Sequence, residues 1–160
     1  MRAHDAALSV DVLVQSPKWK KHRGVAAAVR KAINAAADEI SSPAGEVAVV
    51  LTNDAAIRRL NKQWRKLDKP TNVLSFPATS SAVKKNAALG DIVIAYETLA
   101  RESRDEDKKF AHHLSHLAVH GFLHLMGYDH QNDSDADAME GLERAILARL
   151  RMPDPYVVRG

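Results

Sequence analysis

The chain has 160 residues, 46% of them hydrophobic, which is enough for one domain with a buried core and too few for two. It contains no cysteine, so disulfide bonds are excluded and a transition-metal site would need histidine or carboxylate ligands. Charges interrupt the N-terminus, no later segment reaches the roughly 20 apolar residues of a membrane span, and a net charge of +3 gives only a weak general preference for nucleic acid. We therefore expect a soluble cytoplasmic protein with one domain over residues 1–160.

The first part of the chain alternates predicted strands and helices. LSVDVLVQ (8–15) alternates apolar and polar residues as a half-buried strand does, and Pro17 ends it. Residues 25–40 carry apolar side chains at helical spacing, and EVAVVLT (46–52) is the second predicted strand.

A basic helix and an extended segment follow. Asn53 or Asp54 can cap a helix, and the apolar positions of this helix are Ile57, Leu60 and Trp64. DKPTNVLSFP (68–77) has a proline near each end. Because proline cannot donate to a sheet ladder, VLSF is predicted to be a short edge strand.

The second half of the chain is predicted to be mainly helical. ATSSAVKKNAA (78–88) lacks any period and indicates a mobile loop, whereas LGDIVIAY (89–96) is the last predicted strand. RESRDEDKK (101–109) separates a short helix from a long one that ends at Met126, and residues 134–150 form a final amphipathic helix. This order predicts an α+β fold, with a small mixed sheet of about four strands and helices packed on one side.

HGFLHLMGYDH (120–130) holds three histidines at metal-ligand spacing. His120 and His124 are four residues apart, so they share one helix face about 6 Å apart along the axis. Gly127 tolerates the left-handed conformation that ends helices, which carries His130 toward the same point. The spacing is the H-x-x-x-H-x-x-G-x-x-H spacing of the metzincin proteases, which makes this a zincin-like histidine helix, and it predicts one Zn²⁺ with three histidine ligands and an open fourth position.

Other histidines precede this motif. His116 lies four residues before His120, but this rival pair lacks the glycine turn and the third ligand. We expect His116 to support the ligands from behind or to be packed in the core. His112 and His113 are interpreted as structural or surface residues.

Gly121 occupies the position of the glutamate that serves as general base in H-E-x-x-H proteases. The site is therefore poorly equipped for peptide hydrolysis but is still a Lewis acid that can polarise a phosphoryl oxygen. Phosphate chemistry also needs a cation, and Arg65 is the candidate because guanidinium binds phosphate in a bidentate manner. The alternative is a surface arginine paired with Asp68. The candidate catalytic residues are thus Arg65 and His120.

Four segments resemble the YbeY family of bacterial rRNA-maturation proteins. They are HGFLHLMGYDH, LNKQWRKLDKPTNVLSFP, LGDIVIA and AMEGLERAIL. Together they cover most of Leu60 to Leu147, and the histidine motif is highly specific to that family. The N-terminal third matches only in its pattern of strand and helix.

The resemblance implies a zinc-dependent endoribonuclease that acts on single-stranded RNA in small-subunit rRNA 3′-end maturation and ribosome quality control. The implied partners are an rRNA precursor, the small ribosomal subunit and assembly factors, with no DNA and no membrane expected. The implied metal ligands are His120, His124 and His130, and the family's functionally important arginine is Arg65. Where many members have glycine directly after that arginine, this chain has Lys66.

Two other functions stay open from the sequence. One is a non-catalytic ribosome-assembly factor with a structural zinc, in which Asp129 or Asp133 closes the fourth position. The other is a metalloprotease whose base comes from Glu140 or Glu143. Single-strand RNA recognition usually uses aromatic stacking, and the aromatic residues nearest the motifs, each of which is as easily placed in the core, are Trp64, Phe76 and Tyr128.

Overall fold

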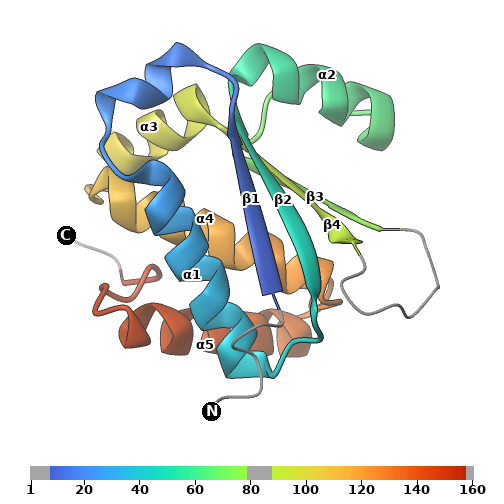
Figure 1. The fold of residues 1–160 in the computed structure, drawn as a ribbon, viewed down its shortest axis with the longest axis vertical. Coiled ribbons are helices and arrows are strands. Elements are labelled where there is room, and N and C mark those ends of the chain that lie inside the picture. The colour runs from blue at the N-terminus through green and yellow to red at the C-terminus, as the bar shows by residue number, and fades with distance from the viewer. Residues whose placement is uncertain (1–7, 79–87, 158–160) are drawn as a thin grey trace.

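A computed structural model describes residues 8–78 and 88–157 (Figure 1). The elements in that part of the chain are β1 (Leu8–Val14), the 3-10 helix η1 (Pro17–Lys21), α1 (Val25–Ile40), β2 (Gly45–Thr52), α2 (Asp54–Arg65), β3 (Val73–Pro77), β4 (Ala88–Ala95), α3 (Tyr96–Asp105), α4 (Phe110–Leu125) and α5 (Asp133–Arg149). None of the helices within the described ranges combines the length and the hydropathy needed to cross a lipid bilayer.

The four strands form one mixed sheet in the order β1-β2-β4-β3. β1 pairs with β2 and β2 with β4 in parallel, while β3 pairs with β4 in antiparallel orientation at the edge. The predicted α+β fold, its strand number and the edge position of VLSF are confirmed.

Apolar side chains cover both faces of the central strands. In β4, Ile92 and Ile94 join the cluster formed with α1, α4 and α5, whereas Val93 and Ala95 join a smaller cluster with Ile57 of α2. Because central strands that are apolar on both faces need cover on both, α2 packs on the face opposite α4. The prediction that the helices pack on one side of the sheet was wrong, and Figure 1 shows α2 apart from the other long helices.

Other boundaries differ from the prediction. α3 continues through Asp105, so most of RESRDEDKK is helical and only residues 106–109 separate α3 from α4. The helix η1 was not predicted; it buries Trp19, whose indole N–H donates to the carbonyl oxygen of Thr52 at 2.9 Å. The loop predicted over residues 78–88 lies almost entirely outside the described residues.

Candidate metal centre

The structure brings the three predicted ligands together. His120 and His124 lie on α4 and His130 lies in the connection to α5, and one ring nitrogen from each lies within 4.8 Å of the others. The Nε2 atoms of His120 and His124 are 3.1 Å apart. The ring centroid of His130 is 5.8 Å from that of His120 and 5.2 Å from that of His124. Side chains ten residues apart in sequence therefore converge on one point.

A glycine turn produces this convergence, as the sequence predicted. Gly127 has a φ of +96° and its N–H donates to the carbonyl oxygen of His124 at 3.0 Å. The N–H of Tyr128 closes the helix end on Leu123. Asn132 then caps α5 by accepting from a backbone N–H at 2.8 Å. Two capped helix ends thus fix the short segment that carries His130.

The donor set fits a divalent transition metal. Two nitrogens that each lie about 2.0–2.1 Å from a tetrahedral zinc are roughly 3.4 Å apart, close to the separation seen between His120 and His124. Burial, followed by the charges of the neighbouring His120 and His130, lowers the pKa of His124. A lowered pKa favours the neutral imidazole, which is the form that binds metal.

Neither acidic candidate for a fourth ligand joins this group. Within the described residues, the group that contains His120 consists of the three histidines alone. Asp129 accepts the backbone N–H of His130 at 2.7 Å, and Asp133 is exposed in the first turn of α5. This arrangement leaves one side of the group without a protein ligand among the described residues.

Glu143 of α5 holds His120 from behind. Its side chain is fully buried, and its Oε2 lies 2.6 Å from Nδ1 of His120. Because a carboxylate only accepts, the proton is on Nδ1 and the lone pair of Nε2 is directed toward His124. Burial would raise the pKa of Glu143, but hydrogen bonds from His116 and His120 outweigh it and lower the pKa to about 2. Glu143 is therefore an ionised support for the imidazole.

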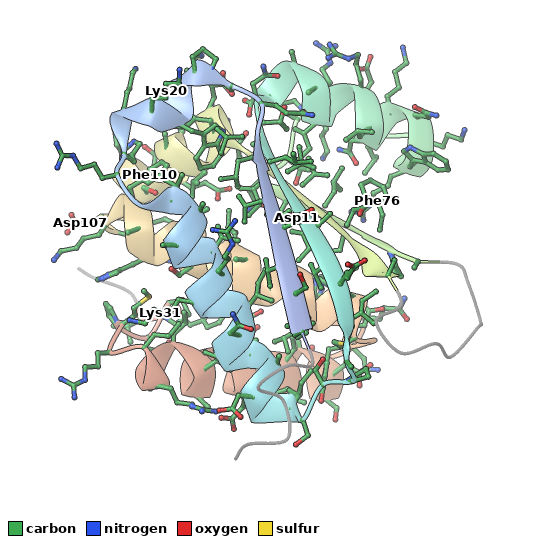
Figure 2. All side chains as sticks on the ribbon, viewed as in Figure 1. Asp11, Lys20, Lys31, Phe76, Asp107 and Phe110 are labelled. Carbon is green, nitrogen blue, oxygen red and sulfur yellow. The ribbon has the colours of Figure 1, made fainter. Side chains whose placement is uncertain are left out.

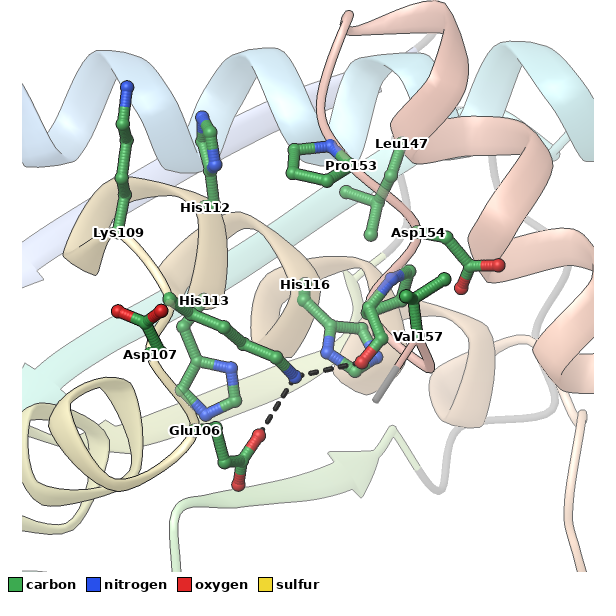
Figure 3. Close-up of a pocket in the computed structure, with 12 residues that line it drawn as sticks. Glu106, Asp107, Lys109, His112, His113, His116, Leu147, Pro153, Asp154 and Val157 are labelled. Atoms are coloured by element: carbon green, nitrogen blue, oxygen red, sulfur yellow. Dashed lines mark hydrogen bonds and ion pairs between the residues drawn. The ribbon is translucent and has the colours of Figure 1, made fainter. Parts of the chain in front are cut away.

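The support extends to the C-terminal segment. His116 donates to Oε1 of Glu143 at 2.9 Å, and the hydroxyl of Tyr156 donates to the same oxygen. Lys108 contacts Glu106 and the carbonyl oxygen of Pro155, each at 2.8 Å, which ties this segment to the start of α4 (Figure 3). His116, expected either to support the ligands or to be packed in the core, is buried and contacts the carboxylate that holds His120.

Figure 3 shows His113 and His116 beside this segment, in a pocket of about 440 Å³ that contains none of the three predicted ligands. A second group at this end of α4, Glu102, Glu106 and His113, also has ligand atoms within 4.8 Å of one another. Glu102 already accepts from His113 at 2.8 Å and from Asn72 at 3.0 Å, and Lys108 neutralises Glu106. Both carboxylates therefore already have hydrogen-bonding or ion-pair partners in the protein. His113, expected to be structural or at the surface, is a buried structural residue.

Gly121 lets α4 approach the sheet closely. A Cβ atom at this position would lie 2.8 Å from Cγ2 of Ile92, 3.2 Å from Oγ of Ser75 and 3.3 Å from Cγ2 of Val73. Successive helical residues point about 100° apart, so a side chain here would enter the sheet, not the histidine group. The position where zinc proteases carry their base is therefore used for packing in this chain.

Glu140 and Glu143, the alternative bases for peptide hydrolysis, are also engaged elsewhere. Glu143 is fixed between His116 and His120, and Glu140 faces Arg144 at 3.8 Å on the surface of α5. Glu143 supports a predicted ligand, a role that the sequence analysis missed. The signal was present, because Glu143 is four residues after Met139 and three before Ile146, on the buried stripe of α5.

Arg65 is the last residue of α2 and is exposed. Asp68 does not pair with it, because Asp68 accepts from Nε of Arg58 at 2.8 Å. Within the described residues the structure gives Arg65 no hydrogen bond or ion pair, and none joins it to the histidine group across the sheet. The adjacent Lys66 has a φ of +62°, the left-handed conformation that glycine adopts at little cost. The departure from glycine thus falls on a strained position.

Comparisons with known proteins identify the family of the chain. The family model described as "Endoribonuclease YbeY" matches residues 13–151. Proteins named "Endoribonuclease YbeY" include one from Bradyrhizobium diazoefficiens, 52% identical over 98% of this chain and 90% of its own length, and one from Nitrobacter winogradskyi, 55% identical over 91% and 80%. A solution structure of a Thermotoga maritima protein has a similar fold, with a TM-score of 0.53 at 23% identity over 92% of this chain and 99% of that one. This chain belongs to the YbeY family.

Proposed function

We propose that this protein is a metal-dependent endoribonuclease that cleaves single-stranded RNA. The observation that carries the proposal is the convergence of His120, His124 and His130, with His120 oriented by a buried carboxylate. The printed name of the relatives, endoribonuclease, supports the same activity. The packing role of Gly121 removes the base that a zinc protease would place there, so a metalloprotease is not favoured.

The proposed cofactor is one Zn²⁺ held by the three histidines. Three imidazole ligands around a position with an open side are typical of catalytic zinc. When bound, the ion supplies Lewis-acid polarisation of a phosphoryl oxygen. His120, the proposed catalytic ligand, keeps its Nε2 lone pair available because Glu143 holds the proton on Nδ1. With neither Asp129 nor Asp133 in the ligand group, a purely structural zinc is not favoured.

Arg65 is proposed to stabilise negative charge on the phosphate. Its exposure and its lack of a protein partner within the described residues support this role, since the guanidinium is free to bind phosphate oxygens. Arg65 ends α2, which packs on the sheet face opposite α4, so an RNA that uses both groups would pass from one face of the sheet to the other.

The proposed substrate is the precursor of small-subunit rRNA, cleaved during 3′-end maturation and ribosome quality control. The small ribosomal subunit and assembly factors are the expected partners, and DNA is not an expected substrate. We place this activity in the cytoplasm, where a chain without cysteine is suited to reducing conditions. Both hydrophobic clusters share one sheet, which supports one domain over residues 1–160.

The test is cleavage of an end-labelled single-stranded RNA by highly purified, zinc-loaded protein. We expect His124→Ala to lose zinc and cleavage while keeping its fold, and Arg65→Ala to keep zinc and lose about 10²- to 10³-fold in rate. The matched controls are His112→Ala on the same helix and Arg104→Ala on the exposed surface of α3. Uncut RNA, or equal cleavage by wild type and both variants, would overturn the proposal.

End-group analysis of the products then defines the nucleophile. Attack by the ribose 2′-hydroxyl leaves a 2′,3′-cyclic phosphate and a free 5′-hydroxyl. Attack by water leaves a phosphate monoester on one fragment and a hydroxyl on the other.

A further inference from the structure

We propose that Trp64 and Phe76 form a stacking platform for a nucleobase of single-stranded RNA, and that the cationic surface of α2 binds the adjoining phosphates. This inference rests on the proposed ribonuclease function and identifies a substrate surface beyond its metal centre. The two tryptophans of the chain differ in solvent exposure. Trp19 is 1% exposed, whereas Trp64 is 62% exposed, the highest value among the exposed large hydrophobic residues of the described chain.

An aromatic neighbour holds Trp64 in place. The ring of Phe76, from β3, lies edge-on to the indole with centroids 6.4 Å apart and planes inclined by 65°. Phe76 is itself partly buried against the apolar cluster beneath α2, on the side of β3 that faces this helix (Figure 2). An indole fixed in this way offers a large surface to a ligand at little cost in side-chain entropy.

The charge around Trp64 indicates a polyanion as the partner. Six cationic and two acidic side chains give residues 54–69 a net charge of +4, whereas the whole chain carries +3. One of the two acids, Asp54, accepts from the N–H and hydroxyl of Thr98, and the other, Asp68, pairs with Arg58; outside this segment, the exposed Asp91 of β4 lies opposite Phe76 in the sheet. The cationic residues are Arg58, Arg59, Lys62, Arg65, Lys66 and Lys69. An exposed aromatic ring beside an excess of exposed cations is the arrangement used for single-stranded nucleic acid.

The position of the platform relative to the metal centre favours a flexible single strand. Phe76 faces α2, while its neighbour Ser75 faces α4 and donates its hydroxyl to the carbonyl oxygen of Gly121 at 2.8 Å. Gly121 directly follows His120. Phe76 and Ser75 thus lie on opposite faces of the edge strand β3, and an RNA that uses both the platform and the metal ligands would pass from one face of the sheet to the other. A stiff duplex is poorly suited to that path.

Fluorescence tests this inference directly, because Trp64 is the exposed one of the two tryptophans. Zinc-loaded protein is rapidly mixed with a single-stranded RNA oligonucleotide, and the emission is recorded before the RNA is consumed. We expect saturable quenching in wild type and none in Trp64→Leu. Since stacking contributes about 1–3 kcal/mol per base, the dissociation constant of Trp64→Leu should rise roughly 5- to 150-fold. Trp64→Phe should retain most of the affinity.

The matched control is Leu13→Ala, which removes an exposed hydrophobic side chain from β1 at the opposite edge of the sheet and should leave RNA binding unchanged. Unchanged RNA affinity in Trp64→Leu would overturn the platform. Binding through Trp64 without any cleavage would contradict the proposed function and leave the platform standing. If the protein cleaves RNA but RNA does not change the fluorescence of Trp64, the platform is contradicted and the proposed function stands.

Discussion

The functional polar residues on the two sides of the sheet differ in burial. Beneath α4, His120 rests on Glu143, which is 0% exposed and has three hydrogen-bonding partners. On α2, the cations and Trp64 project into solvent, and Asp68 pairs with Arg58 at 2.8 Å. A histidine that binds a metal needs a fixed ring orientation, so the carboxylate that orients it is buried. A surface that binds a flexible polyanion needs charges that are accessible to solvent. Changes beneath α4 should therefore alter stability and metal affinity, and changes on α2 should alter RNA binding.

The largest effect is expected for Glu143→Ala. Removing this carboxylate leaves the imidazoles of His116 and His120 and the hydroxyl of Tyr156 without their acceptor, which should cost about 3–5 kcal/mol in the free energy of unfolding. Zinc affinity should fall about 10- to 100-fold, because His120 loses its orientation. Urea denaturation and competitive zinc titration measure the two effects.

The matched control is Glu140→Ala on the surface of the same helix, which should change stability by less than about 0.5 kcal/mol. Equal effects of the two substitutions would show that the buried network does not support the metal centre.

Gly121→Ala is expected to be the next most damaging change. The added Cβ would meet Ile92 at 2.8 Å, so α4 must shift away from the sheet, at a cost of about 1–3 kcal/mol. Gly141→Ala in α5 is the control, since a Cβ there meets nothing within 4 Å and should stabilise the helix by about 0.5–1 kcal/mol. Thermal denaturation of both variants gives the comparison, and a stable Gly121→Ala protein would refute the close packing.

Glu102→Gln should reveal a pH-dependent contribution near the start of α4. Burial raises the pKa of Glu102, but hydrogen bonds from His113 and Asn72 outweigh it, so the pKa lies below its ordinary 4.5. A lowered folded-state pKa stabilises the protein above pH 4.5, and this stabilisation is lost as the pH falls through the folded value. Glu102→Gln should cost about 1–3 kcal/mol at neutral pH and progressively less in acid. A constant difference across a urea-denaturation pH series would contradict this.

The smallest effect on stability is expected for substitutions of Lys66, which distinguish its contribution to stability from its contribution to RNA binding. Lys66→Gly relieves the φ of +62° and should raise the free energy of unfolding by about 1–2 kcal/mol. If Lys66 contacts a phosphate, the same change should reduce the salt dependence of RNA binding by about 0.7 in logarithmic slope. Lys66→Ala is the control, because it removes the charge without relieving the backbone. Equal stability of the two variants would exclude the strain at this residue.

Periodicity predicted most of the fold but not its layering. Residues 25–40 were predicted as a helix and form α1 with the same bounds, because their apolar residues repeat with the helical period. The sequence of α2 specifies an apolar stripe and cannot specify which face of the sheet it covers. RESRD was interpreted as a break because it is charged, yet these residues close the last turns of α3.

Spacing predicted the histidine group because all three residues lie within one helix and the turn that ends it. The support from Glu143 was missed because it joins residues 23 positions apart and depends on how α5 packs against α4. The solvent exposure of Trp64 could not be predicted from the sequence either, since an aromatic residue at helical spacing is consistent with a core or a surface position. Local geometry was therefore predictable, and tertiary contacts were not.

The central claim is that three histidines hold one metal ion with an open position. X-ray absorption spectroscopy of zinc-loaded protein measures this directly. We predict one zinc per chain with three imidazole nitrogens at about 2.0–2.1 Å and one oxygen ligand that exchanges with solvent. A zinc that binds without imidazole, or one closed by a fourth protein ligand, would contradict the account.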